Sequence, residues 1–237
     1  MPTYNNNNYM RLMRPLPKYV ERDIFEIPFI EADKIDITGL NNTRWLINMK
    51  NAKSTDKNAD KKIVHSFCYD NVLTRAYNNP VNFLHRVAKY NAVASFDFSM
   101  HEGMDFRHIL AATYDNRWIG AFLQANGKHV IATVGWVSKE YDEICFAGLR
   151  NGGTFMIATL GINNKECKPA FLRGYLQLRS RYPGSRIICV GDMVKGMDRD
   201  VLYVPYKESF GNWEQYPGFW QMKLLNADGT AFLGGDM

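Results

Sequence analysis

Residues 92–134, AVASFDFSMHEGMDFRHILAATYDNRWIGAFLQANGKHVIATV, contain one complete strand–helix–strand unit. A short apolar run opens the stretch, and apolar residues then recur every three or four positions between Met104 and Gln124. Asn126-Gly127 ends this helical pattern before a second apolar run begins. Two strands joined through a helix of this length lie parallel in one sheet. The stretch therefore predicts a parallel α/β fold.

The same unit recurs along most of the chain. Apolar runs typical of buried strands occur at residues 63–68, 92–96, 129–134, 154–159, 186–190 and 201–204. Most of them are followed by a segment with helical spacing. Such alternation is typical of right-handed β-α-β crossovers and a mainly parallel sheet. We predict an α/β fold: a mostly parallel sheet of repeated β-α units, either open or curled into a partial or distorted barrel.

Outside this core the composition changes. Prolines at positions 15, 17 and 28 exclude a long helix near the start, and a lysine-rich polar loop spans residues 50–62. Beyond residue 204, aromatic residues interleave with glycine and proline, and residues 226–229 (NADG) are typical of a hairpin turn. We predict an extended arm and basic loop over residues 1–62, of which the first eight are loosely held. Residues 63–204 form the core domain, and residues 205–237 form a β-hairpin extension that covers the sheet or mediates oligomerisation.

Composition narrows the classes of partner. The 237 residues are 46% hydrophobic, enough for a full core, and carry a net charge of +5 without a dense basic stripe. We expect weak, sequence-independent binding to nucleic acid at most. The first residues lack a signal-peptide pattern, and no apolar run approaches the roughly 20 residues of a membrane span. The sequence therefore predicts a cytoplasmic protein without a membrane partner.

Known catalytic motifs do not occur in the chain. It has no Walker loop, no G-x-S-x-G elbow, no H-E-x-x-H and no C-x-x-C pair. We therefore predict no metal site, name no cofactor and leave open whether the protein is an enzyme.

Polar residues at the strand ends form the candidate catalytic set. In parallel sheets, ligands bind at the carboxyl ends of the strands. Asp97 and Ser99 directly follow one apolar run, and Asp70 follows the first run. Two carboxylates at one edge can divide the roles of general acid and general base. The alternative is that Asp97, Ser99 and Asp70 cap the next helix or brace a loop.

Five further residues are candidate ligand contacts at the same edge. Trp136 ends the third of these runs, where its ring either stacks on a base or sugar or lines the mouth of a barrel. Gly161, Asn163 and Lys165 combine a glycine turn with the start of a helix, a geometry that attracts phosphate. Arg117 lies in the middle of a helix, where it contacts the ligand or forms a structural salt bridge.

Short motifs occur in a fixed order: YNNP at 77–80, SFDFS at 95–99, NRWIG at 116–120, VIATVGW at 130–136, CFAG at 145–148, TLG at 159–161 and NKE at 164–166. This series resembles an uncharacterised domain family of bacteria, phages and other mobile elements, over about residues 25–204. The resemblance implies the fold and a phage or mobile-element origin, but no reaction. That family commonly has Asp where Ala147 stands, so a function that needs this acid is not expected here.

Three classes of function remain. We favour a site for a nucleotide or sugar-like ligand at the carboxyl ends of the strands, since α/β folds place ligands there so regularly. The second class is a nucleic-acid-associated replication or accessory protein of a mobile element, which would use the loop 50–62 and basic helix positions between 165 and 181. The third is a protein-interaction factor, such as a phage counter-defence protein, that binds through the aromatic C-terminal segment.

Overall fold

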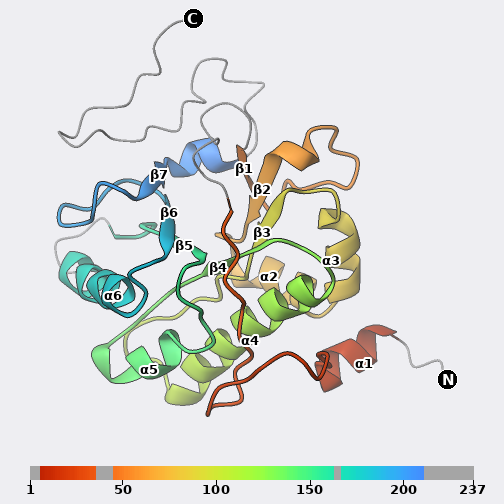
Figure 1. Ribbon diagram of the computed structural model, residues 1–237, viewed down its shortest axis with the longest axis horizontal. Helices are drawn as coiled ribbons and strands as arrows, with labels where there is room; N and C mark the ends of the chain where they lie inside the picture. Colours follow the sequence, from red (N-terminus) through yellow and green to blue (C-terminus); the bar gives the residue numbers. More distant parts are fainter. Residues whose placement is uncertain (1–5, 36–44, 163–166, 211–237) are drawn as a thin grey trace, which may run out of the picture.

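The computed structural model describes residues 6–35, 45–162 and 167–210 (Figure 1). Seven strands in these residues form one sheet in which all neighbours are parallel and the spatial order equals the sequence order. The sheet curls into a partial barrel, which confirms the predicted fold. The strands are β1 (Trp45–Asn48), β2 (Lys62–His65), β3 (Ala92–Ala94), β4 (Val130–Thr133), β5 (Thr154–Ala158), β6 (Arg186–Val190) and β7 (Leu202–Val204).

Helices connect the strands and cover the outer face of the curled sheet (Figure 1). Where the structure describes the chain, they coincide with the segments of helical spacing. None of these described helices is long and apolar enough to cross a bilayer. The helices are α2 (Asp70–Tyr77), α3 (Pro80–Val87), α4 (Phe106–Ala125), α5 (Asp142–Cys145) and α6 (Cys167–Arg181), with short 3-10 turns η2 (Ala59–Lys61) before β2 and η3 (Lys139–Tyr141) before α5.

Alternation along the strands divides the core into two layers. Side chains of one set point into the curl of the sheet and pack against one another, and these are Leu46, Ile63, Ala92, Ala94, Ile131, Met156, Ile188, Val190, Leu202 and Val204. The neighbouring positions, such as Val64, Val93 and Phe155, face the helices. Each fully buried Val, Leu, Ile or Phe side chain contributes about 1.5–3 kcal/mol. Both faces of the sheet are therefore mainly apolar, and most polar side chains of this region lie at the strand ends.

The N-terminal arm packs along the helices and ends at the sheet. It begins with the short helix α1 (Asn6–Met13), which ends before Pro15. The Arg14 guanidinium lies 3.6 Å from the centre of the Tyr77 ring, and the Arg14 carbonyl accepts a hydrogen bond of 2.9 Å from the Trp118 indole. Farther along, Ile35 joins the side chains inside the curl.

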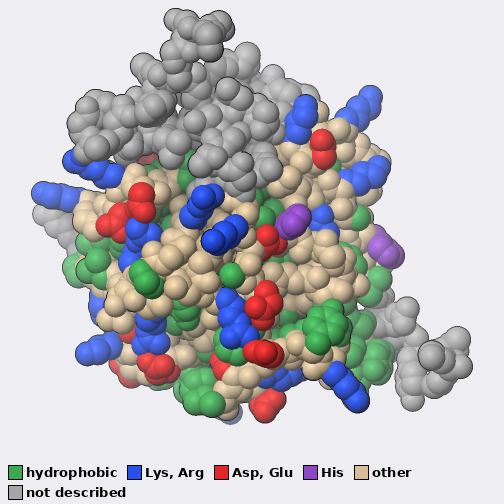
Figure 2. All heavy atoms as spheres, viewed as in Figure 1, with side chains coloured by type: hydrophobic (Ala, Val, Ile, Leu, Met, Phe, Trp, Pro, Cys, Tyr) green, Lys and Arg blue, Asp and Glu red, His purple; other side chains and the backbone are tan. Residues whose placement is uncertain are grey.

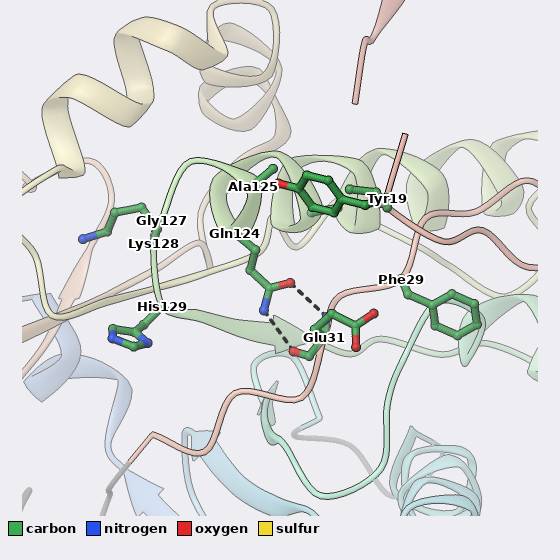
Figure 3. Close-up of a pocket in the computed structure, with 10 residues that line it drawn as sticks. Tyr19, Phe29, Glu31, Gln124, Ala125, Gly127, Lys128 and His129 are labelled. Carbon is green, nitrogen blue, oxygen red and sulfur yellow. Dashed lines mark hydrogen bonds between the residues drawn. The ribbon is translucent and has the colours of Figure 1, made fainter. Parts of the chain in front are cut away.

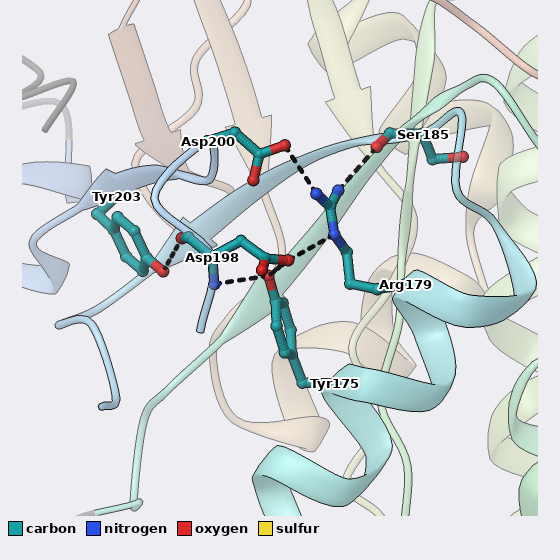
Figure 4. Close-up of polar contacts among 6 residues, drawn as sticks. All are labelled: Tyr175, Arg179, Ser185, Asp198, Asp200 and Tyr203. Atoms are coloured by element: carbon teal, nitrogen blue, oxygen red, sulfur yellow. Dashed lines mark hydrogen bonds and ion pairs between the residues drawn. The ribbon is translucent and has the colours of Figure 1, made fainter. Parts of the chain in front are cut away.

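The crossover from β6 to β7, residues 191–201, contains no helix and is fastened by side chains instead (Figure 4). The Tyr175 hydroxyl donates to Asp198 at 2.7 Å, and Arg179 Nε lies 2.8 Å from the same carboxylate oxygen. Arg179 also binds Asp200 at 2.7 Å, and the Tyr203 hydroxyl donates to the Asp198 carbonyl at 2.9 Å. These contacts hold the crossover against α6.

A short turn, η4 (Tyr206–Phe210), follows the last strand and lies against the first strand, β1. Its Ser209 carbonyl is 2.7 Å from Nε2 of the fully buried His65, whose Nδ1 accepts from the Phe67 N–H at 3.3 Å. Nε2 must therefore carry the proton. Burial lowers the pKa of His65 to about 4, so the ring is neutral at physiological pH. The predicted hairpin near residues 221–233 lies outside the described residues.

Gly174 on α6 provides a test of the packing between helix and sheet. A Cβ at this position would stand 2.1 Å from Cδ1 of the Trp136 ring. We expect Gly174→Ala to lower the free energy of unfolding by about 1–3 kcal/mol in urea titrations, since the ring must shift. Ser180→Ala, at an exposed position of the same helix, is the control. Stabilisation by Gly174→Ala, as helix propensity alone predicts, would contradict this packing.

Candidate functional site

Side-chain hydrogen bonds join the carboxyl ends of β2, β3 and β4. The Ser66 and Thr133 hydroxyls both donate to the Ser95 carbonyl, at 2.6 and 2.7 Å. The Ser95 hydroxyl accepts from the Thr133 N–H at 2.8 Å and donates to Asn116 of α4, also at 2.8 Å. All four side chains are buried. This serine network, formed by Ser66, Ser95, Thr133 and Asn116, continues the strand pairing where the short backbone ladders end.

Asp97 is attached to the serine network. Its backbone N–H donates to the Ser66 hydroxyl at 3.0 Å. The residue as a whole is partly exposed, and its carboxylate accepts no hydrogen bond from any residue that the structure describes. Burial, together with the nearby Asp70 carboxylate, raises the pKa of Asp97 to about 7. Asp97 can therefore exchange a proton near neutral pH.

Asp70 and Ser99 complete the group. Asp70 opens α2, and its Oδ1 accepts from the Ser99 N–H at 3.1 Å and from the Ser99 hydroxyl at 3.0 Å. The structure thus brings the three candidate catalytic residues together at one edge of the sheet. We call Asp70, Asp97 and Ser99 the rim cluster. Within it, Asp70 braces the loop that carries Ser99, whereas the Asp97 carboxylate braces nothing.

Trp136 follows β4 but does not join the rim cluster. Its ring lies beneath α6, 5.2 Å from the centre of the Phe171 ring, and Gly174 makes room for it. Trp136 is therefore part of the packing between the helices and the sheet, and does not line the mouth of a barrel as expected. Gly161 adopts a positive φ of 79° in an open turn. Asn163 and Lys165, the other parts of the expected phosphate site, lie outside the described residues.

Arg117 is inside the protein rather than on a ligand-facing surface. Its guanidinium is 1% exposed and donates to the carbonyls of Ala147, Thr133 and Cys145 at 2.8, 3.0 and 2.9 Å. No salt bridge of Arg117 occurs among the described residues. Burial lowers the pKa of Arg117 to about 10, which leaves the side chain charged at neutral pH. These contacts tie α4 to the segment after α5.

Two residues that support the rim cluster were missed from the sequence. Ser66 anchors the backbone of Asp97, and Gly135 lies beside its carboxylate, since a Cβ at Gly135 would stand in ordinary van der Waals contact with Asp97 Oδ1, at 3.8 Å. Ser66 and Ser95 are each the fourth residue of their apolar runs, and each is followed by Phe. This matched position is the signal that could have identified the pair.

A pocket of about 410 Å³ lies at the opposite end of the sheet, between the arm and the end of α4 (Figure 3). The Gln124 side chain exchanges two hydrogen bonds of 2.9 Å with the backbone of Glu31. The Lys128 amine donates to two backbone carbonyls, and His129 Nδ1 lies 3.0 Å from an Asp33 carboxylate oxygen. Because these polar groups already bind the protein, the pocket serves to hold the arm, and the rim cluster is the better candidate site.

Comparison with known families matches residues 20–207 to the domain of unknown function DUF4417. The chain belongs to this family. It is also similar to the Gene 1 protein of Mycobacterium phage L5, with 28% identity over 169 residues, which are 70% of each chain. The Gene 1 protein of Mycobacterium phage D29 is 26% identical over 161 residues, 68% of this chain and 56% of the phage protein. These relatives associate the family with phages, as the motifs implied. No solved protein structure matches the chain.

The rim cluster gives this DUF4417 chain a limited chemical repertoire. In the part of the chain that the structure describes, no three His, Cys, Asp or Glu side chains are placed to hold a metal ion together. His65 cannot act as a base for the cluster, because both of its ring nitrogens already make hydrogen bonds. Asp97 is the group with a free carboxylate and a pKa near 7, so proton transfer and hydrogen bonding to a donor are what the cluster can supply.

Arg117→Met tests the structural role of the buried guanidinium in this DUF4417 chain. The variant removes the guanidinium donors of the Ala147 and Cys145 carbonyls, whereas the Thr133 carbonyl still accepts from Asn116 Nδ2 at 3.0 Å. We therefore expect the free energy of unfolding to fall by about 3 kcal/mol in urea titrations. Arg75→Met, at an exposed position of α2, is the control and should change stability by less than about 0.5 kcal/mol. Similar values for the two variants would argue against this role.

Asp97 should make stability depend on pH in a recognisable way. Its pKa is raised from 3.8 to about 7, so between these pH values the folded state holds a proton that the unfolded chain has lost, and stability falls as the pH rises across this window and levels off above 7. Asp97→Asn cannot ionise. We therefore expect the Tm of the wild type, relative to Asp97→Asn, to fall between pH 5 and pH 8 by about 4–8 °C, equivalent to about 2 kcal/mol.

The comparison with Asp97→Asn cancels the titration of His65, which is present in both proteins. Asp60→Asn, which removes an exposed carboxylate of η2, is the matched control. A difference in Tm between wild type and Asp97→Asn that stays constant from pH 5 to pH 8 would show that Asp97 is not shielded in the folded protein.

Proposed function

We propose that the rim cluster binds a small ligand that presents hydroxyl or amino donors, of the kind found on a nucleotide or a sugar. In this proposal Asp97 accepts a hydrogen bond from the ligand and can take its proton. The observation that carries the proposal is the Asp97 carboxylate itself, which is shielded by the protein and yet has no donor among the described residues. A shielded carboxylate without a partner reduces stability, so a ligand that supplies the missing donor is its natural complement.

Three features of the surroundings support a ligand at this position. Asp97 follows β3 at the carboxyl edge of a parallel sheet, where α/β proteins bind their ligands. Gly135 lies beside this carboxylate and adds no side chain of its own there. Ser99, which is exposed, adds a hydroxyl 3.0 Å from Asp70 Oδ1 that can contact the same ligand. Sugar and ribose hydroxyls are donors that neighbouring carboxylates commonly bind.

A thermal-shift screen of nucleotides and monosaccharides tests the proposal. A ligand at 100 times its Kd should stabilise the wild type by about 2.7 kcal/mol, which corresponds to about 5–10 °C in Tm. We expect this shift to disappear in Asp97→Asn, because the amide loses both charge and basicity, and to be retained in the control Asp60→Asn. A ligand that stabilises wild type and Asp97→Asn equally binds elsewhere and contradicts the proposal, as does a panel without any hit.

A further inference from the structure

The crossover between β1 and β2 presents a row of exposed lysines. Within the residues that the structure describes, none of them forms an ion pair with an acidic side chain. Figure 2 shows Lys and Arg side chains standing out from the surface over this crossover, at the upper right. We call this row the basic track, and its members are Lys50, Lys53, Lys57, Lys61 and the adjoining Lys89.

Four arginines elsewhere on the protein are paired with carboxylates. Arg150 pairs with Glu21 and Glu31, and Arg173 pairs with Asp142. Arg179 and Arg181 also bind carboxylates, those of Asp198, Asp200 and Glu143. The basic track is thus a local positive field on a protein whose overall charge of +5 is modest. A field of this kind attracts a polyanion.

The backbone that carries the track is held in place. The Tyr90 hydroxyl accepts from the Lys53 N–H at 2.9 Å and donates to the Lys53 carbonyl at 3.1 Å. Lys62 Nζ lies 2.7 Å from Asp56, and both side chains are largely buried, so this acid does not offset the track. Of the acidic residues in the crossover, Asp60 is the exposed one. The lysines are therefore presented at fixed spacing rather than on a loose loop.

An aromatic ring stands where the track meets the rim of the sheet. Tyr69 directly follows Cys68 after β2, its side chain is 77% exposed, and the amine of Lys50 lies 5.7 Å from its ring centre. An exposed ring beside a row of lysines is the arrangement by which proteins bind single strands: bases stack on the ring and phosphates bind the cations. Paired bases of a duplex could not stack on it.

The other exposed side chains of the crossover disfavour a lipid surface. Ser54, Thr55 and Asp60 lie between the lysines, and none of the exposed large hydrophobic side chains belongs to residues 50–62. Segments that bind anionic membranes usually insert apolar side chains between their basic residues. We propose that the basic track and Tyr69 bind single-stranded nucleic acid without sequence preference. This inference does not depend on a ligand in the rim cluster.

The first experiment measures fluorescence anisotropy of a labelled 20-nucleotide oligothymidylate at several salt concentrations. We expect Lys53→Glu/Lys57→Glu/Lys61→Glu to bind at least 10-fold more weakly than wild type. The slope of log K against log salt should become shallower by about two, because each phosphate contact on a single strand contributes about 0.7. The matched control is Lys139→Glu/Lys168→Glu/Lys195→Glu, which makes the same change of net charge at exposed lysines outside the track.

Thermal melts establish that both triple Glu variants fold. A variant with Gln at the same three track positions removes the charge without reversing it, and should also weaken binding. Equal loss of binding in the two triple Glu variants would mean that only overall charge matters, and would overturn the assignment to the track. Wild type that fails to bind the oligonucleotide at 50 mM salt, or that binds anionic phosphatidylserine vesicles through the track instead, would overturn the choice of partner.

The second experiment isolates the aromatic contact. Tyr69→Ala should weaken binding of the single strand about 10-fold, since one stacked base contributes on this scale. Tyr69→Phe keeps the ring and should bind like wild type. Both variants should bind a duplex of the same length equally. If Tyr69→Ala weakens duplex and single-strand binding alike, or neither, stacking on Tyr69 is excluded.

Discussion

The hydrogen bonds among Ser66, Ser95 and Thr133 are the constraint on which the site depends. β3 is three residues long, and its pairing with β2 and with β4 includes only two Cα pairs on each side. Such short ladders leave the carboxyl ends of the central strands weakly held. Beyond these ladders, hydrogen bonds of 2.6–2.8 Å that involve the serine and threonine hydroxyls join the strands, and Asn116 connects them to α4. Loss of the Ser95 hydroxyl would leave the buried Thr133 N–H without its acceptor, and loss of the Ser66 hydroxyl would do the same to the Asp97 N–H.

Asp97 and Arg117 show how a structural charge differs from one available for binding. Both side chains are shielded by the protein, and burial shifts both pKa values toward the neutral form. Arg117 directs its donors to backbone carbonyls, so its charge stabilises the joint between α4 and the following segment. The Asp97 carboxylate accepts no hydrogen bond from the described residues, although the Asp97 N–H is bonded to the Ser66 hydroxyl. This shielding without a partner is the basis of the proposal that Asp97 binds a ligand.

The two ends of the sheet differ in what contacts them: the arm at the amino ends of the strands, and the rim cluster at the carboxyl ends. At the amino ends of the strands the arm packs against the sheet. Ile35 joins the side chains inside the curl, and Asp33 binds both His129 and the Val130 N–H. The polar side chains of the pocket of about 410 Å³ at that end, Gln124, Lys128 and His129, already bind the arm or the neighbouring backbone. At the carboxyl ends the rim cluster and Tyr69 remain partly or fully exposed. The residues of the candidate site thus lie at one edge of the sheet.

Sequence alone determined six of the seven strands (all but β1), the parallel pairing and the position of the rim cluster, because apolar runs and helical spacing are local, and parallel strands carry their ends to one edge. It did not determine the direction of individual side chains. Trp136 follows β4 as Asp97 follows β3, yet it packs under α6 against Gly174. Likewise, nothing local distinguishes the buried Arg117 from an exposed helix arginine. Those outcomes were decided by the tertiary structure, since burial and pKa depend on neighbours that lie far away in the chain.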